Sequence, residues 1–225
     1  MSKPLENELS RLKSKLLTLS ALVEERVYQA VRSISERNSE LASRVLDGDE
    51  EIDDMEVEIE EDCLKILALH QPVALDLRFV VASLKINNDL ERIGDLAVNI
   101  AERSIFLAGQ PPVRVPFDFD DMAQKTRTML KHALDAMIQF NSKLANQVCL
   151  ADEEVDEINR EMYHKVYSEI KRTPDDVIPL IHFLSVSRHL ERIADYATNI
   201  AEDVMYIVEG KIFRHKPEEF RAGSN

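Results

Sequence analysis

The chain has 225 residues, a formal net charge of −14 at pH 7, 44% hydrophobic residues and no tryptophan. This length allows one large core or two small ones, and so acidic a chain is repelled by phosphates, which disfavours nucleic acid as a partner. With only 5 glycines and 8 prolines, long helices are favoured over a turn-rich β fold. No apolar run approaches the roughly 20 residues that span a bilayer, and the N-terminus lacks the apolar core of a signal peptide. We therefore expect a cytoplasmic protein without direct membrane insertion.

Three helices are expected in the first half of the chain. The first covers about Leu5–Leu46, where apolar residues recur at helical spacing, and Asp47–Asp49 ends it. The second continues to about His70, and Gln71-Pro72 turns the chain. The third covers about Val73–Ala108. Short turns between these helices predict that neighbours run antiparallel.

A proline-rich segment, residues 109–120, follows the third helix. It holds three of the eight prolines and cannot be helical throughout, so we interpret it as a linker. Three further helices are expected after it, at about Asp121–Cys149, Asp152–Lys171 and Val177–Glu209, with a turn at Thr173-Pro174.

The two halves of the chain are copies of one unit. ERIGDLAVNIAE, which begins at Glu91, matches ERIADYATNIAE, which begins at Glu191, at nine of twelve positions. DEEID at Asp49 likewise matches DEEVD at Asp152. The repeat predicts an all-α fold of two tandem antiparallel three-helix bundles related by approximate two-fold symmetry. The predicted domains are residues 1–108 and 121–210, followed by a frayed tail at 211–225.

Acidic residues recur at positions i and i+4 in each repeat, so each pair shares one helix face. Counting outward from Pro72 places Asp53 level with Glu91 in the folded hairpin, and Asp49 level with Asp95. Counting from Pro174 gives the same arrangement in the second unit. Four carboxylates are therefore expected to converge on each hairpin: Asp49, Asp53, Glu91 and Asp95 in the first unit, and Asp152, Asp156, Glu191 and Asp195 in the second.

Four carboxylates that converge repel one another unless something neutralises them. A bound cation would do so, and oxygen ligands suit Mg, Ca, Mn or Fe better than Zn. Arg92 and Arg192 adjoin the motifs but project about 100° away from the glutamates. The same helical geometry points Asp95 away from the core seam, which predicts carboxylates on the bundle surface. Spacing alone leaves open a solvated acidic face without metal.

A catalytic site is not predicted. Glu161 and His164 form one Glu-x-x-His step, whereas di-iron bundles use two. The sequence has no glycine-rich phosphate loop. The alternatives to a binding protein are a di-iron-type helical enzyme and a metal-free helical scaffold.

Three segments of the chain carry a resemblance to a known family. HQPVALDLR (70–78), KINNDLERIGDLAVNIAE (85–102) and LERIADYATNIAE (190–202) resemble the PhoU family of bacterial phosphate-signalling regulators, and the resemblance covers nearly the whole chain. It implies a non-enzymatic homodimer that negatively regulates the phosphate-starvation response. Such a protein acts at the inner face of the membrane, between the high-affinity phosphate ABC transporter and a sensor histidine kinase.

The resemblance also implies a cofactor. Some PhoU-like proteins carry multinuclear iron, or another divalent metal such as Zn, Ni, Mn or Mg, on the bundle surface in Glu/Asp-x-x-x-Asp motifs. The eight carboxylates match those motifs, and Asn99 and Asn199 match as ligands or as groups that orient ligands. Ala194 and Tyr196 replace a glycine and a histidine of the family pattern, which puts the equivalence of the two sites in question.

Overall fold

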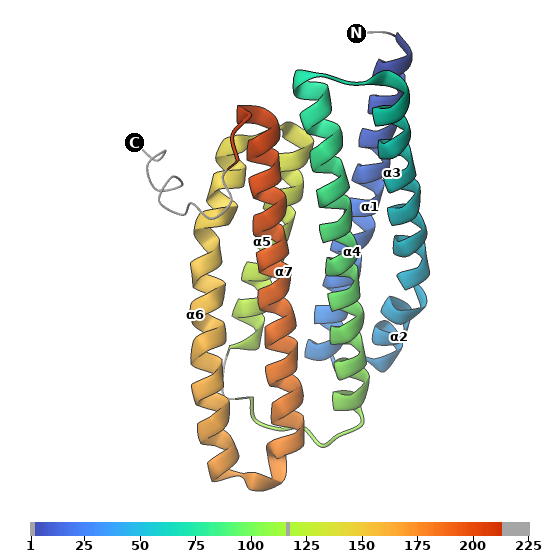
Figure 1. Ribbon diagram of the computed structural model, residues 1–225. Helices are drawn as coiled ribbons and strands as arrows, with labels where there is room; N and C mark the ends of the chain where they lie inside the picture. Colours follow the sequence, from blue (N-terminus) through green and yellow to red (C-terminus); the bar gives the residue numbers. More distant parts are fainter. Residues whose placement is uncertain (1–2, 116–117, 213–225) are drawn as a thin grey trace.

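The computed structural model describes residues 3–115 and 118–212, and all regular secondary structure in these ranges is helical. The all-α prediction is confirmed (Figure 1). None of the described helices is long and apolar enough to cross a membrane. The elements are α1 (Lys3–Ser35), α2 (Ser39–Asp47), α3 (Asp49–His70), α4 (Ala74–Ala108), α5 (Phe119–Gln139), α6 (Ser142–Arg172), a 3₁₀ turn (Pro174–Asp176) and α7 (Val177–Glu209).

The helices form two bundles, with α1 to α4 in one and α5 to α7 in the other, and α4 and α7 lie side by side between them (Figure 1). Arg78 donates to the carbonyl of Ile207 across this seam at 3.2 Å, and the ring of Phe106 stacks on His182 with centroids 3.9 Å apart. The start of α4 therefore meets the end of α7, and the second bundle is inverted relative to the first. Both repeated motifs consequently lie near mid-length of the molecule.

The long first helix predicted from the sequence is wrong, because the chain breaks between α1 and α2. Arg37 has a left-handed backbone, with φ of 52°, and its guanidinium donates to carbonyls at the end of α4, including that of Leu107 at 2.7 Å. The side chain of Asn38 then accepts from the amide of Leu41 at 3.0 Å and starts α2. A left-handed residue followed by an asparagine cap ends one helix and begins the next without a loop.

The same device breaks the second unit, at a position the sequence did not predict. Phe140 is left-handed, with φ of 50°, and Asn141 caps α6 by accepting from the amide of Leu144 at 3.1 Å. The break expected near Asp152 is wrong, since α6 runs through it without interruption. The first unit is interrupted at the equivalent point, where Gly48 separates α2 from α3.

The linker is shorter than predicted at its C-terminal end. Asp118 caps α5 by accepting from the amide of Asp121 at 3.0 Å, so the helix begins at Phe119. Of the predicted tail, residues 213–225 lie outside the described part of the chain. The domain boundaries at 108 and 121 stay predictions.

Loss of the second-unit cap tests the role of the asparagines. Asn141→Ala is expected to destabilise the protein by about 1 kcal/mol, because the amide of Leu144 loses its acceptor. Urea unfolding followed by circular dichroism measures the change. Asn141→Asp keeps the acceptor and is expected to unfold at nearly the wild-type midpoint; equal losses for the two variants would contradict the capping role.

Candidate metal centre

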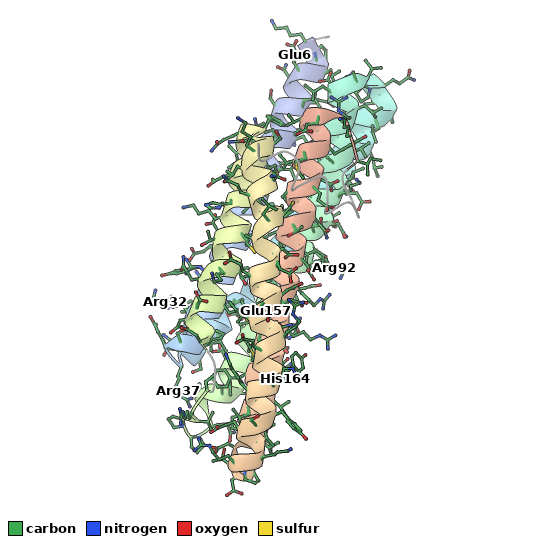
Figure 2. The ribbon with its side chains drawn as sticks, turned by 90° about the vertical axis from the view of Figure 1, so that its left-hand side faces the viewer. Glu6, Arg32, Arg37, Arg92, Glu157 and His164 are labelled. Carbon is green, nitrogen blue, oxygen red and sulfur yellow. The ribbon has the colours of Figure 1, made fainter. Side chains whose placement is uncertain are left out.

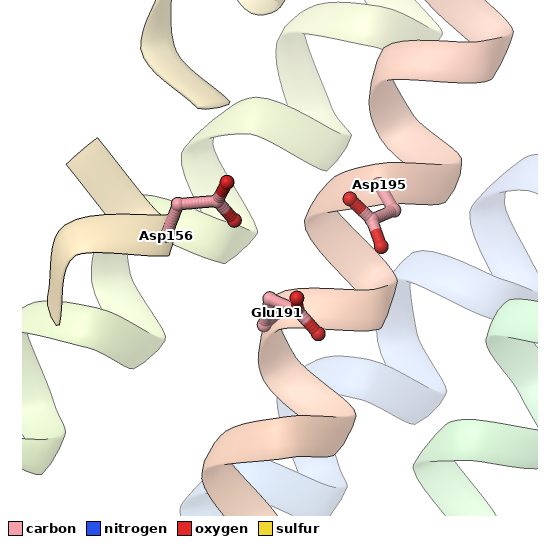
Figure 3. Close-up of side chains that lie close together, drawn as sticks. All are labelled: Asp156, Glu191 and Asp195. Carbon is pink, nitrogen blue, oxygen red and sulfur yellow. The ribbon is translucent and has the colours of Figure 1, made fainter. Parts of the chain in front are cut away.

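Three carboxylates of the second unit converge between α6 and α7. One oxygen from each of Asp156, Glu191 and Asp195 lies within 4.8 Å of the others, and Figure 3 shows the three side chains facing one space. Asp156 and Glu191 are half-buried and Asp195 is exposed, so the group opens to solvent. Within residues 3–115 and 118–212, no other three His, Cys, Asp or Glu side chains converge in this way. The surface position agrees with the helical geometry expected from the sequence.

Asp152 lies one turn before Asp156 on α6 and adds a fourth carboxylate. Its Oδ1 is buried, beside the side chain of Thr198. Burial, and then the charges of Asp195 and Asp156, raise the pKa of Asp152 to about 6. Partial loss of solvent around its carboxyl group, and then the charges of Glu191 and Asp156, raise the pKa of Asp195 to about 6, while Arg192 lowers it. The folded chain thus holds its negative charge here at a cost, which a proton or a cation would relieve.

The donor set fits a hard divalent cation. Carboxylate oxygens are the ligands that Mg²⁺, Mn²⁺ and Fe²⁺ favour, and the pKa values of all four carboxyls, Asp152, Asp156, Glu191 and Asp195, are raised. The three convergent groups include no histidine or cysteine, which Zn²⁺ favours. Metal binding itself stays a prediction.

The equivalent cluster in the first unit differs. Burial, and then the charges of Asp53 and Asp95, raise the pKa of Asp49, while Arg26 lowers it. Burial and the charge of Asp95 also raise the pKa of Glu91. The four carboxylates therefore share one neighbourhood, as predicted, but they do not converge as tightly as those of the second unit.

Arginines lie near both clusters: Arg160, Arg188 and Arg192 counter the raised pKa values in the second unit, and Arg26 and Arg92 lie beside the first. The side chain of Arg92 folds back along α4, with Nε 3.4 Å from Glu91 and Nη1 3.3 Å from Asp95, so the expectation that it projects away is wrong. Arg26, which was not predicted from the sequence, reaches over from α1 and lies 3.3 Å from Glu51. At the 103-residue shift that aligns Asp49 with Asp152, its counterpart in the second unit is Met129, and this difference between the repeats is the sequence signal for Arg26.

The two asparagines flank the clusters. Asn99 is half-buried and donates from Nδ2 to the backbone carbonyl of Asp95 at 2.8 Å, so its amide group is engaged within α4. Asn199 is half-buried one turn beyond Asp195. The structure therefore favours a structural role for Asn99, and ligation by either residue stays a prediction.

Core packing accounts for one departure from the family pattern. In the first unit, a Cβ on Gly94 would lie 3.2 Å from the side chain of Ile52, which is closer than ordinary contact. In the second unit, the counterpart of Gly94 is Ala194, and the counterpart of Ile52 is the smaller Val155. The smaller valine leaves room for the extra methyl group. Both Ala194 and Val155 are fully buried, and this exchange does not alter the carboxylates.

The second departure also lies at a core position. Tyr196 is partly buried against the hydrophobic core, and its counterpart in the first unit is Leu96, which is 3% exposed. A side chain at this position packs inward in both units. The absence of an imidazole at Tyr196 is therefore compatible with the three convergent carboxylates.

The single Glu-x-x-His step does not build a di-iron site. Glu161 and His164 are exposed on α6, where Figure 2 labels His164. Glu161 is paired with Lys165 at 2.6 Å. These positions agree with the expectation that a single Glu-x-x-His step does not mark a catalytic site.

The raised pKa of Asp195 predicts a pH-dependent stability in metal-free protein. The pKa of Asp195 is about 6 in the folded protein and about 4 in the unfolded chain. Protonation therefore favours the fold, fully below pH 4, and this stability is lost as the pH rises through 6 and the charge forms. With EDTA present, Asp195→Asn should therefore raise Tm at pH 7.5 and leave it nearly unchanged at pH 4. Asp54→Asn, at an exposed site, controls for net charge. A gain that is equal at both pH values would contradict the shifted pKa.

Comparison with known proteins places the chain in a family. The profile of the PhoU domain matches it twice, at residues 16–104 and 119–204. A phosphate-specific transport system accessory protein PhoU homolog of Aquifex aeolicus is 37% identical over 93% of this chain and 95% of its own length. The homolog of Clostridium acetobutylicum is 33% identical over 92% of this chain and 94% of its own. These relatives are named as accessory proteins, which agrees with a non-enzymatic role.

Solved structures give the same result. The crystal structure of PhoU from Pseudomonas aeruginosa superposes with a TM-score of 0.88 at 36% identity, covering 92% of this chain and 99% of that one. The phosphate transport system regulatory protein PhoU from Streptococcus pneumoniae gives a TM-score of 0.81 at 28% identity, covering 92% and 98%. On the doubled domain, the curated relatives and the shared fold, this chain belongs to the PhoU family.

Proposed function

We propose that this protein is a negative regulator of the phosphate-starvation response. It acts in the cytoplasm at the inner face of the membrane, where it modulates the phosphate-specific ABC transporter and its sensor histidine kinase. The observation that carries the proposal is the likeness, over more than nine-tenths of the chain, to accessory proteins of phosphate-specific transport. The relatives' names support a role in regulating phosphate transport. Action on the ABC transporter and on the histidine kinase goes further than those names and is part of what we propose.

The surface of the protein supports binding to other proteins. Leu69 and Val73 are 66% and 73% exposed at the α3–α4 turn, and Tyr167 and Ile178 are 61% and 57% exposed near the α6–α7 turn. These turns lie at opposite ends of the molecule (Figure 1). Large apolar side chains exposed together are typical of protein interaction sites. We assign them to contacts with transport components and with a second copy of the chain in a homodimer.

The second-unit carboxylates supply the cofactor part of the proposal. A divalent cation held by Asp156, Glu191 and Asp195 would cancel the repulsion across the α6–α7 interface and give that surface a fixed shape. Such a cation is structural, since no nucleophile or histidine joins the three convergent carboxylates. The chemistry that it supplies is charge neutralisation.

Gene deletion tests the regulatory role. In a strain that lacks this protein, phosphate-uptake genes are expected to be expressed in high phosphate at the level normally reached only in starvation. A plasmid copy of the wild-type gene should restore repression. Transcript measurement in both phosphate conditions provides the readout, and normal repression in the deletion strain would overturn the proposal.

Metal analysis tests the cofactor. Protein purified without chelator and loaded anaerobically with Fe²⁺ or Mn²⁺ should retain metal after gel filtration. Glu191→Gln combined with Asp195→Asn should abolish retention, because two of the three convergent ligands are lost. Glu157→Gln, an exposed change on α6 beside the cluster, should have no effect. Wild-type protein that retains no metal would remove the cofactor from the proposal.

A further inference from the structure

A cavity lies where the two bundles meet the linker between α4 and α5. Its volume is about 730 Å³, and its walls come from the ends of α1 and α4, the linker, the start of α5 and single side chains of α6 and α7. The linker and the α6–α7 turn lie at the same end of the molecule (Figure 1). Small-molecule sites are typically concave, have volumes of about 300 to 1,000 Å³ and occur preferentially between domains. The cavity therefore has the size and the location of a ligand site.

Apolar side chains make up part of the cavity wall. Phe119 of α5 and Phe183 of α7 pack edge to face, with ring centroids 6.4 Å apart. Leu107 adds an aliphatic side chain from α4, and Val113 adds one from the linker. A molecule that fills this cavity would therefore bury an apolar body.

Three cationic side chains from separate segments line the same cavity: Arg37 after α1, Arg114 in the linker and Lys165 on α6. Figure 2 labels Arg37, whose hydrogen bonds to carbonyls at the end of α4 and in the linker all use Nη2. Arg114 is exposed near Glu169, and Lys165 pairs with the exposed Glu161 at 2.6 Å. Exposed ion pairs are weak, so an anionic ligand can compete for these cations.

Two acidic side chains of the cavity wall are already engaged. Oδ1 of Asp118 accepts from the amide of Asp121 at 3.0 Å, and Oδ1 of Asp120 accepts from the hydroxyl of Ser35 at 3.1 Å. The net charge of the chain is −14, yet the wall of this cavity carries three cations and two acids. The local charge balance therefore favours an anion.

A buried hydroxyl adds an unmet hydrogen-bonding group. Ser104 of α4 lines the cavity and is 1% exposed, and its Oγ has no hydrogen-bond partner among the described residues. Buried hydroxyls are normally paired, and an unpaired one destabilises the protein that holds it. A polar atom of a bound ligand would supply the missing partner.

The equivalent place in the second unit is filled by an aromatic side chain. The left-handed residue Phe140 stands there as the counterpart of Arg37, and the hollow that it lines has a volume of about 200 Å³. Phe140 packs edge to face on Phe79, with centroids 6.0 Å apart, and Lys13 lies over its ring at 4.6 Å. The larger, cation-lined cavity is therefore a feature of one end of the molecule and not of the repeated unit.

We propose that this cavity binds a small organic anion. Its phosphate or carboxylate group contacts Arg37, Arg114 and Lys165, and its apolar body packs against Phe119 and Phe183. The acidic clusters lie near mid-length of the molecule, so the inference goes beyond the regulatory role and the metal and depends on neither. Because the walls come from both bundles and the linker, binding is expected to raise Tm.

A fluorescent aromatic anion, anilinonaphthalene sulfonate, tests binding to the full-length protein. We expect saturable binding, and displacement of the dye by octyl phosphate or octanoate below their critical micelle concentrations. The more effective competitor identifies the preferred head group, and displacement by neither would overturn the proposal. Inorganic phosphate at the same concentration should leave the dye bound, because it has no apolar body. Equal displacement by inorganic phosphate would contradict the organic part of the ligand.

Paired charge variants test the role of the cations. Arg114→Gln with Lys165→Gln should weaken dye binding about tenfold, because two ion contacts are lost. Arg11→Gln with Lys65→Gln removes the same charge from exposed positions on α1 and α3 and should match wild type. Equal weakening in the two double variants would overturn the proposal, and so would wild-type protein that does not bind the dye saturably.

Energy transfer locates the bound dye. The chain has no tryptophan, so Phe183→Trp introduces a single donor at the cavity, and Phe140→Trp introduces one at the opposite end of the molecule. Transfer to the dye should be stronger from Phe183→Trp, and stronger transfer from Phe140→Trp would contradict the site. If Phe183→Trp fails to fold by circular dichroism, the paired charge variants still decide.

Discussion

Repulsion between carboxylates on adjoining helices is the constraint on which the middle of this structure depends. Each hairpin places acidic groups from two helices side by side, at mid-length of the bundle, where burial raises their pKa values. Ionised groups in this position oppose the packing of the helices that carry them. Positive charge near the clusters opposes this repulsion, from Arg26 in the first unit and from Arg160, Arg188 and Arg192 in the second.

The surrounding architecture fixes the geometry of this repulsion. Left-handed Arg37 and Phe140, each followed by an asparagine cap, start the second segment of each unit at the same register. The antiparallel seam of α4 and α7 is held by contacts such as the 2.9 Å ion pair of Lys85 with buried Asp203. Helices anchored at these points bring Asp156 on α6 beside Glu191 and Asp195 on α7.

Much of the fold could be predicted from the sequence because its signals are periodic and repeated. Apolar spacing predicted long helices, and ERIGDLAVNIAE with ERIADYATNIAE predicted the duplication. The helix breaks at Arg37 and Phe140 were missed, since neither residue type signals a left-handed backbone. The carboxylate clusters were predicted from spacing, whereas the role of Arg26 was not. The guanidinium of Arg26, on α1, lies against Gly48 at the junction of α2 and α3. A contact between segments this far apart in the sequence becomes visible only in the packed structure.

The central claim is the proposal that a metal ion neutralises the convergent carboxylates of the second unit. Anomalous scattering from crystals of the protein grown with Mn²⁺ tests it most directly. The account predicts a peak between α6 and α7, among Asp156, Glu191 and Asp195. The absence of a peak at this place would contradict it.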